Sequence, residues 1–171
     1  DWIYAGLNGS TSPAVPAPWV ISPEVTIANA TIQAPAEAVV TNNTAGNHTV
    51  YARVAIDGVT ARTNPPTALY PNFGAQIGYT TDTNQPLTNW SWRTMTYAAD
   101  FSTNAANNDD EYPHTTNNLS VGTNYYAVRF TLDTNNPSWR YAGRNWSSTT
   151  NSADLASLQL GQLVVENASV G

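Results

Sequence analysis

Residues 48–60 read HTVYARVAIDGVT and alternate in character along their length. Val50, Ala52, Val54 and Ile56 fall on one side of an extended chain, with Tyr51 and other residues on the opposite side. Successive side chains of a strand point to opposite faces of a sheet, so this period of two predicts a strand with one buried face. The stretch therefore indicates a sheet packed against a hydrophobic core.

The same pattern recurs on both sides of this stretch. Residues 124–133 place Tyr126, Val128 and Phe130 on one face, and residues 25–32 alternate with a slip near Ala28. Shorter strands are predicted at residues 75–79, 90–97 and 139–141, whereas residues 155–165 fit either a closing strand or a short helix followed by a strand. Seven to nine short strands separated by turn signals predict an all-β protein, an antiparallel β-sandwich that is Ig-like or jelly-roll-like.

The 171 residues are enough for one domain of ordinary size. Residues 1–23 contain Pro13, Pro16 and Pro18, which favour an extended chain. We therefore expect an extended Pro-rich N-terminal segment over residues 1–23 and a single β-sandwich domain over residues 24–171. The apolar residues of that segment are candidates for an inter-subunit strand that completes the sheet of a neighbouring copy: Trp2, Ile3, Tyr4 and Leu7.

The chain contains a short internal repeat. Residues 2–8 and residues 139–145 share the pattern W-x-Y-A-G-x-N. One interpretation is chance in a biased composition. The other is that both segments suit similar strand positions, in which case the first copy could occupy such a position in a neighbouring subunit.

Composition excludes several classes of protein. The net charge is −6 with six Arg and no Lys, so we expect no nucleic acid partner. No run of 18 apolar residues occurs, so we expect no membrane span. The absence of Cys excludes a thiol nucleophile, a Cys-ligated zinc site and a disulfide scaffold. The sequence begins at Asp1 without a leader, and we expect that a leader has been removed and that the protein is secreted, extracellular or at the cell surface.

The N-glycosylation signal Asn-x-Ser/Thr predicts covalent glycans on exposed positions. Alternatively, Asn and Thr simply populate turns and outer strand faces. The candidates are Asn8, Asn29, Asn42, Asn47, Asn89, Asn118, Asn145 and Asn167.

Residues 107–111 form the one dense acidic cluster. Asp109, Asp110 and Glu111, together with two preceding Asn, offer the oxygen ligands that Ca²⁺ prefers. The spacing is not that of an EF-hand, and a solvated turn in a loop over residues 103–110 is the alternative. Calcium is the one cofactor that the sequence suggests.

Exposed aromatic rings on a sheet can stack on sugars, and Trp90, Trp92, Trp139 and Trp146 are candidates for this role. The alternative is that these rings fill a core or a subunit contact. Catalysis is not indicated: His48 and His114 are the two His, and no nucleophile elbow, phosphate loop or zinc-protease motif occurs. We therefore expect a protein that is not an enzyme.

Several stretches between residues 75 and 145 carry a resemblance to a known family. They are Ala75-Gln-Ile-Gly-Tyr79, Trp90-x-Trp92, Asn107-Asn-Asp-Asp-Glu-Tyr112, residues 126–133 and Trp139-x-Tyr-Ala142. This region resembles a β-sandwich accessory module that recurs in secreted multidomain bacterial proteins, including amylase-type and nuclease-type enzymes. The resemblance implies a non-catalytic module with a role in carbohydrate contact or spacing.

Together these observations predict a non-catalytic, secreted and glycosylated structural subunit. It would polymerise with copies of itself into an extracellular fibre, pilus or surface coat by N-terminal strand donation. The alternative is a carbohydrate-binding accessory module that uses exposed Trp residues.

Overall fold

The computed structural model describes residues 25–35, 37–41, 48–60, 65–100, 109–116 and 119–167. These residues form strands and three short 3₁₀ helices, and none of them lies in an α-helix. The strands are β1 (Ile27–Ala34), β2 (Glu37–Thr41), β3 (His48–Ile56), β4 (Gly74–Thr80), β5 (Ser91–Thr94), β6 (Ala99–Asp100), β7 (Asp109–Thr116), β8 (Gly122–Thr131), β9 (Arg140–Ala142), β10 (Ser148–Thr149) and β11 (Gly161–Glu166). The 3₁₀ helices are η2 (Pro66–Ala68), η3 (Leu87–Asn89) and η4 (Leu155–Ser157).

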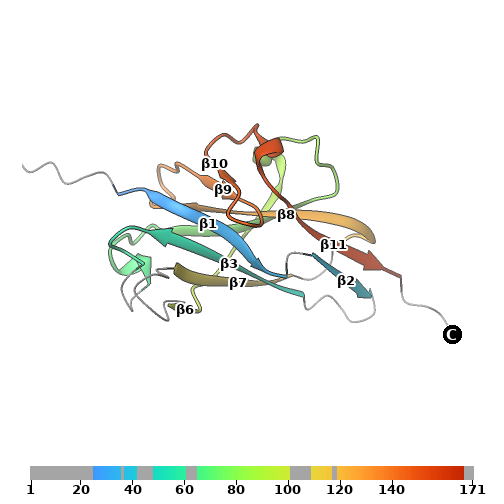
Figure 1. The fold of residues 1–171 in the computed structure, drawn as a ribbon, viewed down its shortest axis with the longest axis horizontal. Coiled ribbons are helices and arrows are strands. Elements are labelled where there is room, and N and C mark those ends of the chain that lie inside the picture. The colour runs from blue at the N-terminus through green and yellow to red at the C-terminus, as the bar shows by residue number, and fades with distance from the viewer. Residues whose placement is uncertain are drawn as a thin grey trace, which may run out of the picture.

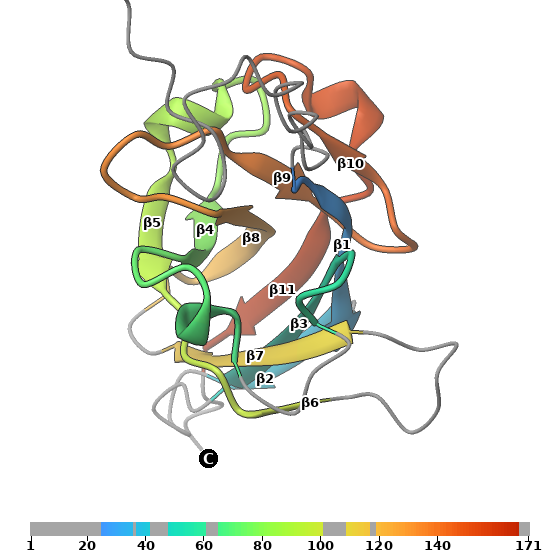
Figure 2. The ribbon, with the colours of Figure 1, turned by 90° about the vertical axis from the view of Figure 1, so that its left-hand side faces the viewer.

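The strands form two sheets (Figure 1). The first sheet has the order β1-β3-β7-β6, and all its pairs are antiparallel. In the second sheet β8 is central. Strand β4 pairs with one edge of β8, and β5 pairs with the far edge of β4. Strands β11 and β9 pair with two successive parts of the other edge of β8. Strand β2 pairs with β11, and β10 pairs with β9. Figure 2 shows β4, β8 and β11 passing opposite β1, β3 and β7.

This arrangement confirms the predicted all-β sandwich. Its strand order is that of an immunoglobulin-type sandwich. In the immunoglobulin lettering, strands A, B, E and D of one sheet are β1, β3, β7 and β6. In the other sheet strands C and F are β4 and β8, and the place of strand G beside β8 is shared by β9 and β11. Strand β5 is an additional strand beside β4. Two details differ from the prediction: the described residues form eleven strands instead of seven to nine, and β2 runs parallel to β11, so the second sheet is mixed.

The main core lies between the two sheets and follows the alternation seen in the sequence. Val50, Val54 and Ile56 of β3 are fully buried, as are Val128 and Phe130 of β8. Burying one such side chain contributes about 1.5–3 kcal/mol. The alternating residues of these two strands therefore drive the packing of one sheet on the other.

The outer face of the second sheet is covered as well, by an outer cluster. This cluster consists of Leu87, Trp90, Ala127, Tyr141 and Leu158, with Trp92, Trp139, Leu155 and Leu160 packed against it. The backbone NH of Leu87 donates a 3.0 Å hydrogen bond to the Ser152 carbonyl oxygen, which joins the two loops that carry η3 and η4. Strand β8 is consequently buried on both faces.

Three local expectations can be compared with the structure. The slip near Ala28 is a register irregularity between Ile27 and Asn29. Residues 155–165 form η4 and then β11, the second of the two alternatives. The predicted loop over residues 103–110 was wrong at its end, because β7 begins at Asp109. The expected boundary between residues 23 and 24 lies outside the described residues.

Candidate functional site

The second copy of the repeated pattern forms β9 and the turn that follows it. Tyr141 pairs with Arg129 of β8 and is buried in the outer cluster, whereas Ala142 pairs with Val128 and is buried in the main core. The ring of Trp139 lies over Arg129, with its centroid 4.1 Å from the guanidinium carbon. The Trp, Tyr and Ala of the pattern therefore all have defined packing roles on the two faces of one strand.

Gly143 is required by a close approach of backbone. Its carbonyl oxygen accepts hydrogen bonds from the Ile32 NH at 2.8 Å and from the Thr31 hydroxyl at 3.2 Å. A Cβ atom at this position would lie 2.3 Å from the carbonyl oxygen of Gln159. No residue with a side chain fits there without movement of the backbone.

Asn145 and Trp146 form a tight hairpin turn. Their φ angles are 53° and 60°, and the Ser147 NH donates a 3.0 Å hydrogen bond to the Arg144 carbonyl oxygen. Positive φ at both central residues is the signature of a type I′ turn, which prefers Asn followed by Gly. Asn145 fits this preference, whereas a left-handed conformation of Trp146 costs about 1–2 kcal/mol. Each of the five shared residues thus occupies a position with a specific packing or backbone requirement. This favours the structural interpretation of the repeat over chance.

The four candidate sugar-stacking rings are placed differently from one another. Trp90 is 5% exposed, too little for stacking on a sugar, and its ring stacks on Trp92 with a centroid distance of 6.2 Å. Trp92 and Trp139 are half-buried, and the guanidinium of Arg129 lies 4.1 Å from each of their ring centroids. Trp146, 44% exposed, stands apart from this stack.

Arg129 organises the stack, and sequence reasoning missed it. Its Nε and Nη2 atoms donate hydrogen bonds of 2.8 and 2.5 Å to Gln76 Oε1, and burial lowers the pKa of the guanidinium from its usual value. The alternation of β8 places Arg129 on the opposite face of the strand from Val128. From the sequence alone, the face that carries Arg129 looked solvent-exposed. No Trp lies next to Arg129 in the sequence, so the available signal was only an Arg among aromatic and apolar residues in a chain with few charges.

The acidic candidates lie in a strand. Asp109, Asp110 and Glu111 are consecutive residues of β7, so their side chains alternate between its two faces. Asp109 Oδ2 is 3.9 Å from Arg53 Nη1, and Asp110 is fully buried. Within the ranges that the structure describes, no three His, Cys, Asp or Glu side chains are placed to hold a metal ion. Calcium binding stays a prediction.

Four of the glycosylation candidates can be located. Asn29, Asn89, Asn145 and Asn167 are all exposed. Asn145 differs from the others because its amide nitrogen donates a 2.8 Å hydrogen bond to Gln159 Oε1. The remaining candidates lie outside the described residues, as do the predicted donor-strand residues: Asn8, Asn42, Asn47, Asn118, Trp2, Ile3, Tyr4 and Leu7.

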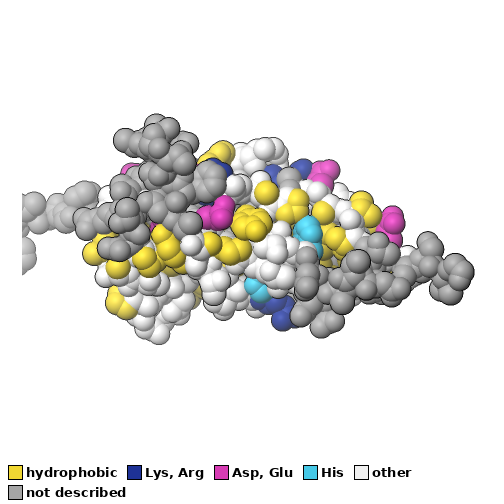
Figure 3. All heavy atoms as spheres, turned by 90° about the horizontal axis from the view of Figure 1, so that it is seen from below, with side chains coloured by type: hydrophobic (Ala, Val, Ile, Leu, Met, Phe, Trp, Pro, Cys, Tyr) yellow, Lys and Arg dark blue, Asp and Glu magenta, His cyan; other side chains and the backbone are white. Residues whose placement is uncertain are grey.

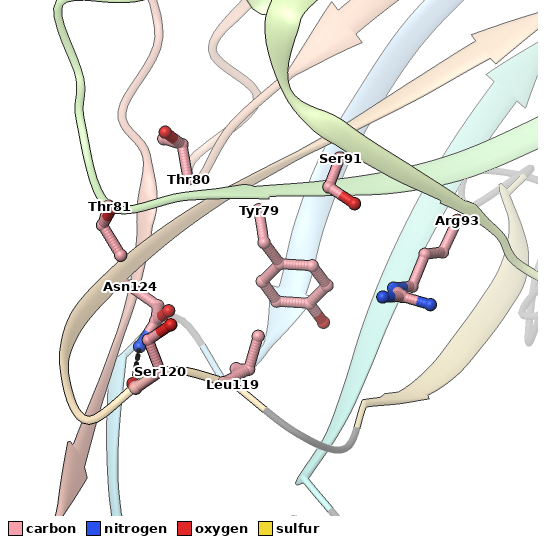
Figure 4. Close-up of a pocket in the computed structure, with 8 residues that line it drawn as sticks. All are labelled: Tyr79, Thr80, Thr81, Ser91, Arg93, Leu119, Ser120 and Asn124. Atoms are coloured by element: carbon pink, nitrogen blue, oxygen red, sulfur yellow. Dashed lines mark hydrogen bonds between the residues drawn. The ribbon is translucent and has the colours of Figure 1, made fainter.

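A pocket of about 250 Å³ opens beside β4 and β5 (Figure 4). The Tyr79 ring and the Arg93 side chain point into the same space, and burial raises the pKa of Tyr79 to about 12. Its lining residues are Tyr79, Thr80, Thr81, Ser91, Arg93, Leu119, Ser120 and Asn124. Among these eight described residues the hydroxyl groups have no His or carboxylate partner that could act as a base. The lining of this pocket therefore offers no nucleophile–base pair.

The edge strands of the two sheets differ in how well they are protected against pairing with a strand of another chain. In the described part of the chain, β5 pairs with β4 alone and β2 with β11 alone. At β5, Arg93 places a charge on the edge, and His114 Nδ1 lies 2.9 Å from the Thr94 carbonyl oxygen. At β2, Val39 is 64% exposed, the highest exposure among the large hydrophobic residues of the described strands. Charges and irregularities normally protect edge strands. The one charged residue of β2, Glu37, lies at its start and is paired with Arg144, so the stretch around the exposed Val39 is the less protected edge of the two.

The surface of the domain carries few charges. The view from below shows hydrophobic side chains among neutral ones, with isolated acidic, basic and His side chains (Figure 3).

Comparison of the sequence with known protein families and with curated proteins gave no match. None of the helices in the described part of the chain has the length and apolar character needed to cross a membrane.

Proposed function

We propose that this protein is a secreted, glycosylated, non-catalytic structural subunit. Copies assemble into an extracellular fibre, pilus or surface coat, each donating its N-terminal strand to the next. The observation that carries this proposal is the conformation of residues 139–145. There, the pattern shared with residues 2–8 forms a strand that buries side chains on both faces of a sheet.

The N-terminal copy has the residues for the same conformation. Gly6 corresponds to Gly143, where a Cβ does not fit, and Asn8 corresponds to Asn145 in the type I′ turn. Asn8 is followed by Gly9, so the N-terminal copy contains the Asn-Gly pair that this turn prefers. Residues 2–9 therefore match a type I′ hairpin at least as well as residues 139–146 do.

The place for this strand is on another copy. Within the chain's own second sheet, the position beside β8 is already filled by β9. In an extended chain Trp2 and Tyr4 share one face while Ile3, Ala5 and Leu7 share the other, so both faces are apolar. A strand of that kind is stabilised when it is added to an exposed sheet edge of a neighbour.

The reach of the segment is sufficient. Residues 8–24, which would connect the donor strand to Val25, span up to about 56–61 Å when extended. A domain of this size has a radius of gyration of about 15 Å. The donor can therefore cross one subunit and engage the next.

Removal of residues 1–12 tests the proposal. The core formed by the described residues is made by side chains between Ile27 and Val165, so we expect the shortened chain to remain folded and to form no fibres. The matched control replaces Ser10, Thr11 and Ser12 with Ala in the full chain and should polymerise as the parent does. Negative-stain microscopy and mass in solution give the readout. Normal polymers from the shortened chain would overturn the proposal.

A carbohydrate-binding accessory module is the second candidate, and Trp146 is the observation that favours it. Strained backbone conformations persist where function maintains them, and this turn holds an exposed indole where Gly would fit better. Titration of Trp fluorescence with a panel of polysaccharides tests it. Saturable quenching that is lost in Trp146→Gly would support this candidate, and its absence in the parent protein would contradict it.

A further inference from the structure

We infer that the edge of β2 that does not face β11 is the acceptor for residues 2–7 of the next copy. This inference rests on the proposed function and deepens it by naming the acceptor. The edge offers the backbone groups of Glu37–Thr41 to an added strand.

The other edges of the described sheets are less suitable. Strands β6 and β10 contain two residues each. The edge of β1 is irregular at both ends and is partly closed by the hydrogen bond from the Ile32 NH to the Gly143 carbonyl oxygen. The edge of β5 carries the charge of Arg93 and the contact between His114 and Thr94. Strand β2 also carries a charge, Glu37, but this residue lies at the start of the strand and is paired with Arg144, and Ala38–Thr41 are uncharged.

The side chains of β2 match those of the proposed donor. Ala38 and Val40 pack against the main core and are half-buried, so apolar surface is left exposed next to the core. Val39 points away from that core and is 64% exposed. A donor strand with Ile3, Ala5 and Leu7 on one face and Trp2 and Tyr4 on the other would cover both sets of side chains.

The position of β2 favours an open chain of subunits. In Figure 1, β1 begins at the left of the molecule, where the chain enters the domain, and β2 lies at the right. A contact between two different patches on opposite ends of a subunit is heterologous. Heterologous contacts that do not close into a ring build filaments. The inferred acceptor therefore predicts a head-to-tail fibre.

Engineered disulfides test the inference directly, because the chain contains no Cys. Each of residues 2–7 is changed to Cys in turn and combined with Val39→Cys in the full chain, and assembly proceeds under oxidising conditions. We expect a ladder of disulfide-linked oligomers on non-reducing gels, strongest at alternate donor positions because a strand has a period of two. The matched control combines the same donor variants with Thr94→Cys on β5, which should give no ladder.

The other outcomes overturn the inference in distinguishable ways. Fibres that form without a Val39 ladder, or with a Thr94 ladder, place the donor elsewhere and leave the proposed function standing. A disulfide within one monomer shows that the chain's own segment fills the edge. A parent protein that forms no fibres overturns the proposed function together with the inference.

A pair of substitutions provides a second readout. Val39→Lys puts a charge on the acceptor edge and should raise the concentration needed for polymerisation at least about tenfold, equivalent to about 1.4 kcal/mol. Val39→Thr keeps a β-branched side chain and should polymerise nearly as the parent does. Because Val39 is mostly exposed, both variants should fold. Equal polymerisation of the Lys variant and the parent would contradict the inference.

Discussion

The guanidinium carbon of Arg129 lies 4.1 Å from the ring centroid of Trp92, on the outer face of the second sheet. Trp139 lies at the same distance from Arg129, so the cation is held between two indoles. This stack fixes the start of β9 against β8 and β5. It gives residues 139–145 the packing on which the proposed role of the N-terminal copy depends.

Replacement of Arg129 should weaken the fold. A desolvated cation–π contact is worth about 2 kcal/mol and a hydrogen bond from a charged group about 1.5–3 kcal/mol. We expect Arg129→Ala to lower the free energy of unfolding by about 3 kcal/mol, measured by denaturant titration. The control is Arg93→Ala, since Arg93 is exposed on β5 and its loss should cost less than about 0.5 kcal/mol. Equal effects of the two variants would contradict this account of the stack.

The close approach at Gly143 predicts a steric penalty. In Gly143→Ala the new Cβ would press on the Gln159 carbonyl oxygen, and we expect a loss of about 3 kcal/mol. Gly58→Ala is the comparison: its φ is 71°, but the added Cβ would meet no atom within 4 Å. Strain alone should cost about 1 kcal/mol there. Thermal and denaturant unfolding of both variants measure the difference, and a mild effect at Gly143 would disprove the requirement for Gly in the shared pattern.

Stability should fall at alkaline pH. Burial raises the pKa of Tyr79 from its usual 10.0 to about 12, and burial also raises the pKa values of Tyr112 and Tyr126. Above pH 10 the unfolded chain releases these protons while the folded chain retains them, so the unfolded state binds fewer protons and stability decreases as pH rises. Tyr79 alone contributes a loss of about 2 kcal/mol between pH 10 and pH 12. Denaturant titrations from pH 8 to pH 11.5 should show this decline, and it should be shallower in Tyr79→Phe.

Glycan occupancy should follow the environment of each signal. Asn29, Asn89 and Asn167 are exposed, and we expect mass spectrometry of the protein from its natural source to find them modified. Asn145 should be modified least, because its amide nitrogen is hydrogen-bonded within a tight turn. Gln159→Ala removes that bond and should raise occupancy at Asn145. Unmodified peptides at all four positions would contradict the prediction of a glycoprotein.

The strands with one buried face could be predicted from the sequence, and those with other constraints could not. The alternation of Val50, Val54 and Ile56 predicted β3 because one side of the strand faces the core. Strand β7 was missed because its sequence is acidic at the start and contains Pro113 and His114, which suggest a loop. Strand β2 was missed because Ala38, Val39 and Val40 are consecutive apolar residues and show no alternation.

The candidate site was only partly visible in the sequence for a related reason. The repeated pattern could be seen, but the reasons for its Gly and Asn could not. Gly143 is required by a contact with Gln159, and such contacts between distant segments depend on the folded arrangement of the strands. The burial of Trp90 was likewise hidden, because it depends on loops around η3 and η4 that cover a face expected to meet solvent.

Strand donation between copies is the central claim, and negative-stain microscopy of the 171-residue chain, beside its mass in solution, tests it most directly. The account predicts long uniform fibres and a mass far above that of one chain. A monomer near 18.4 kDa plus its glycans, with no fibres at any concentration, would contradict it.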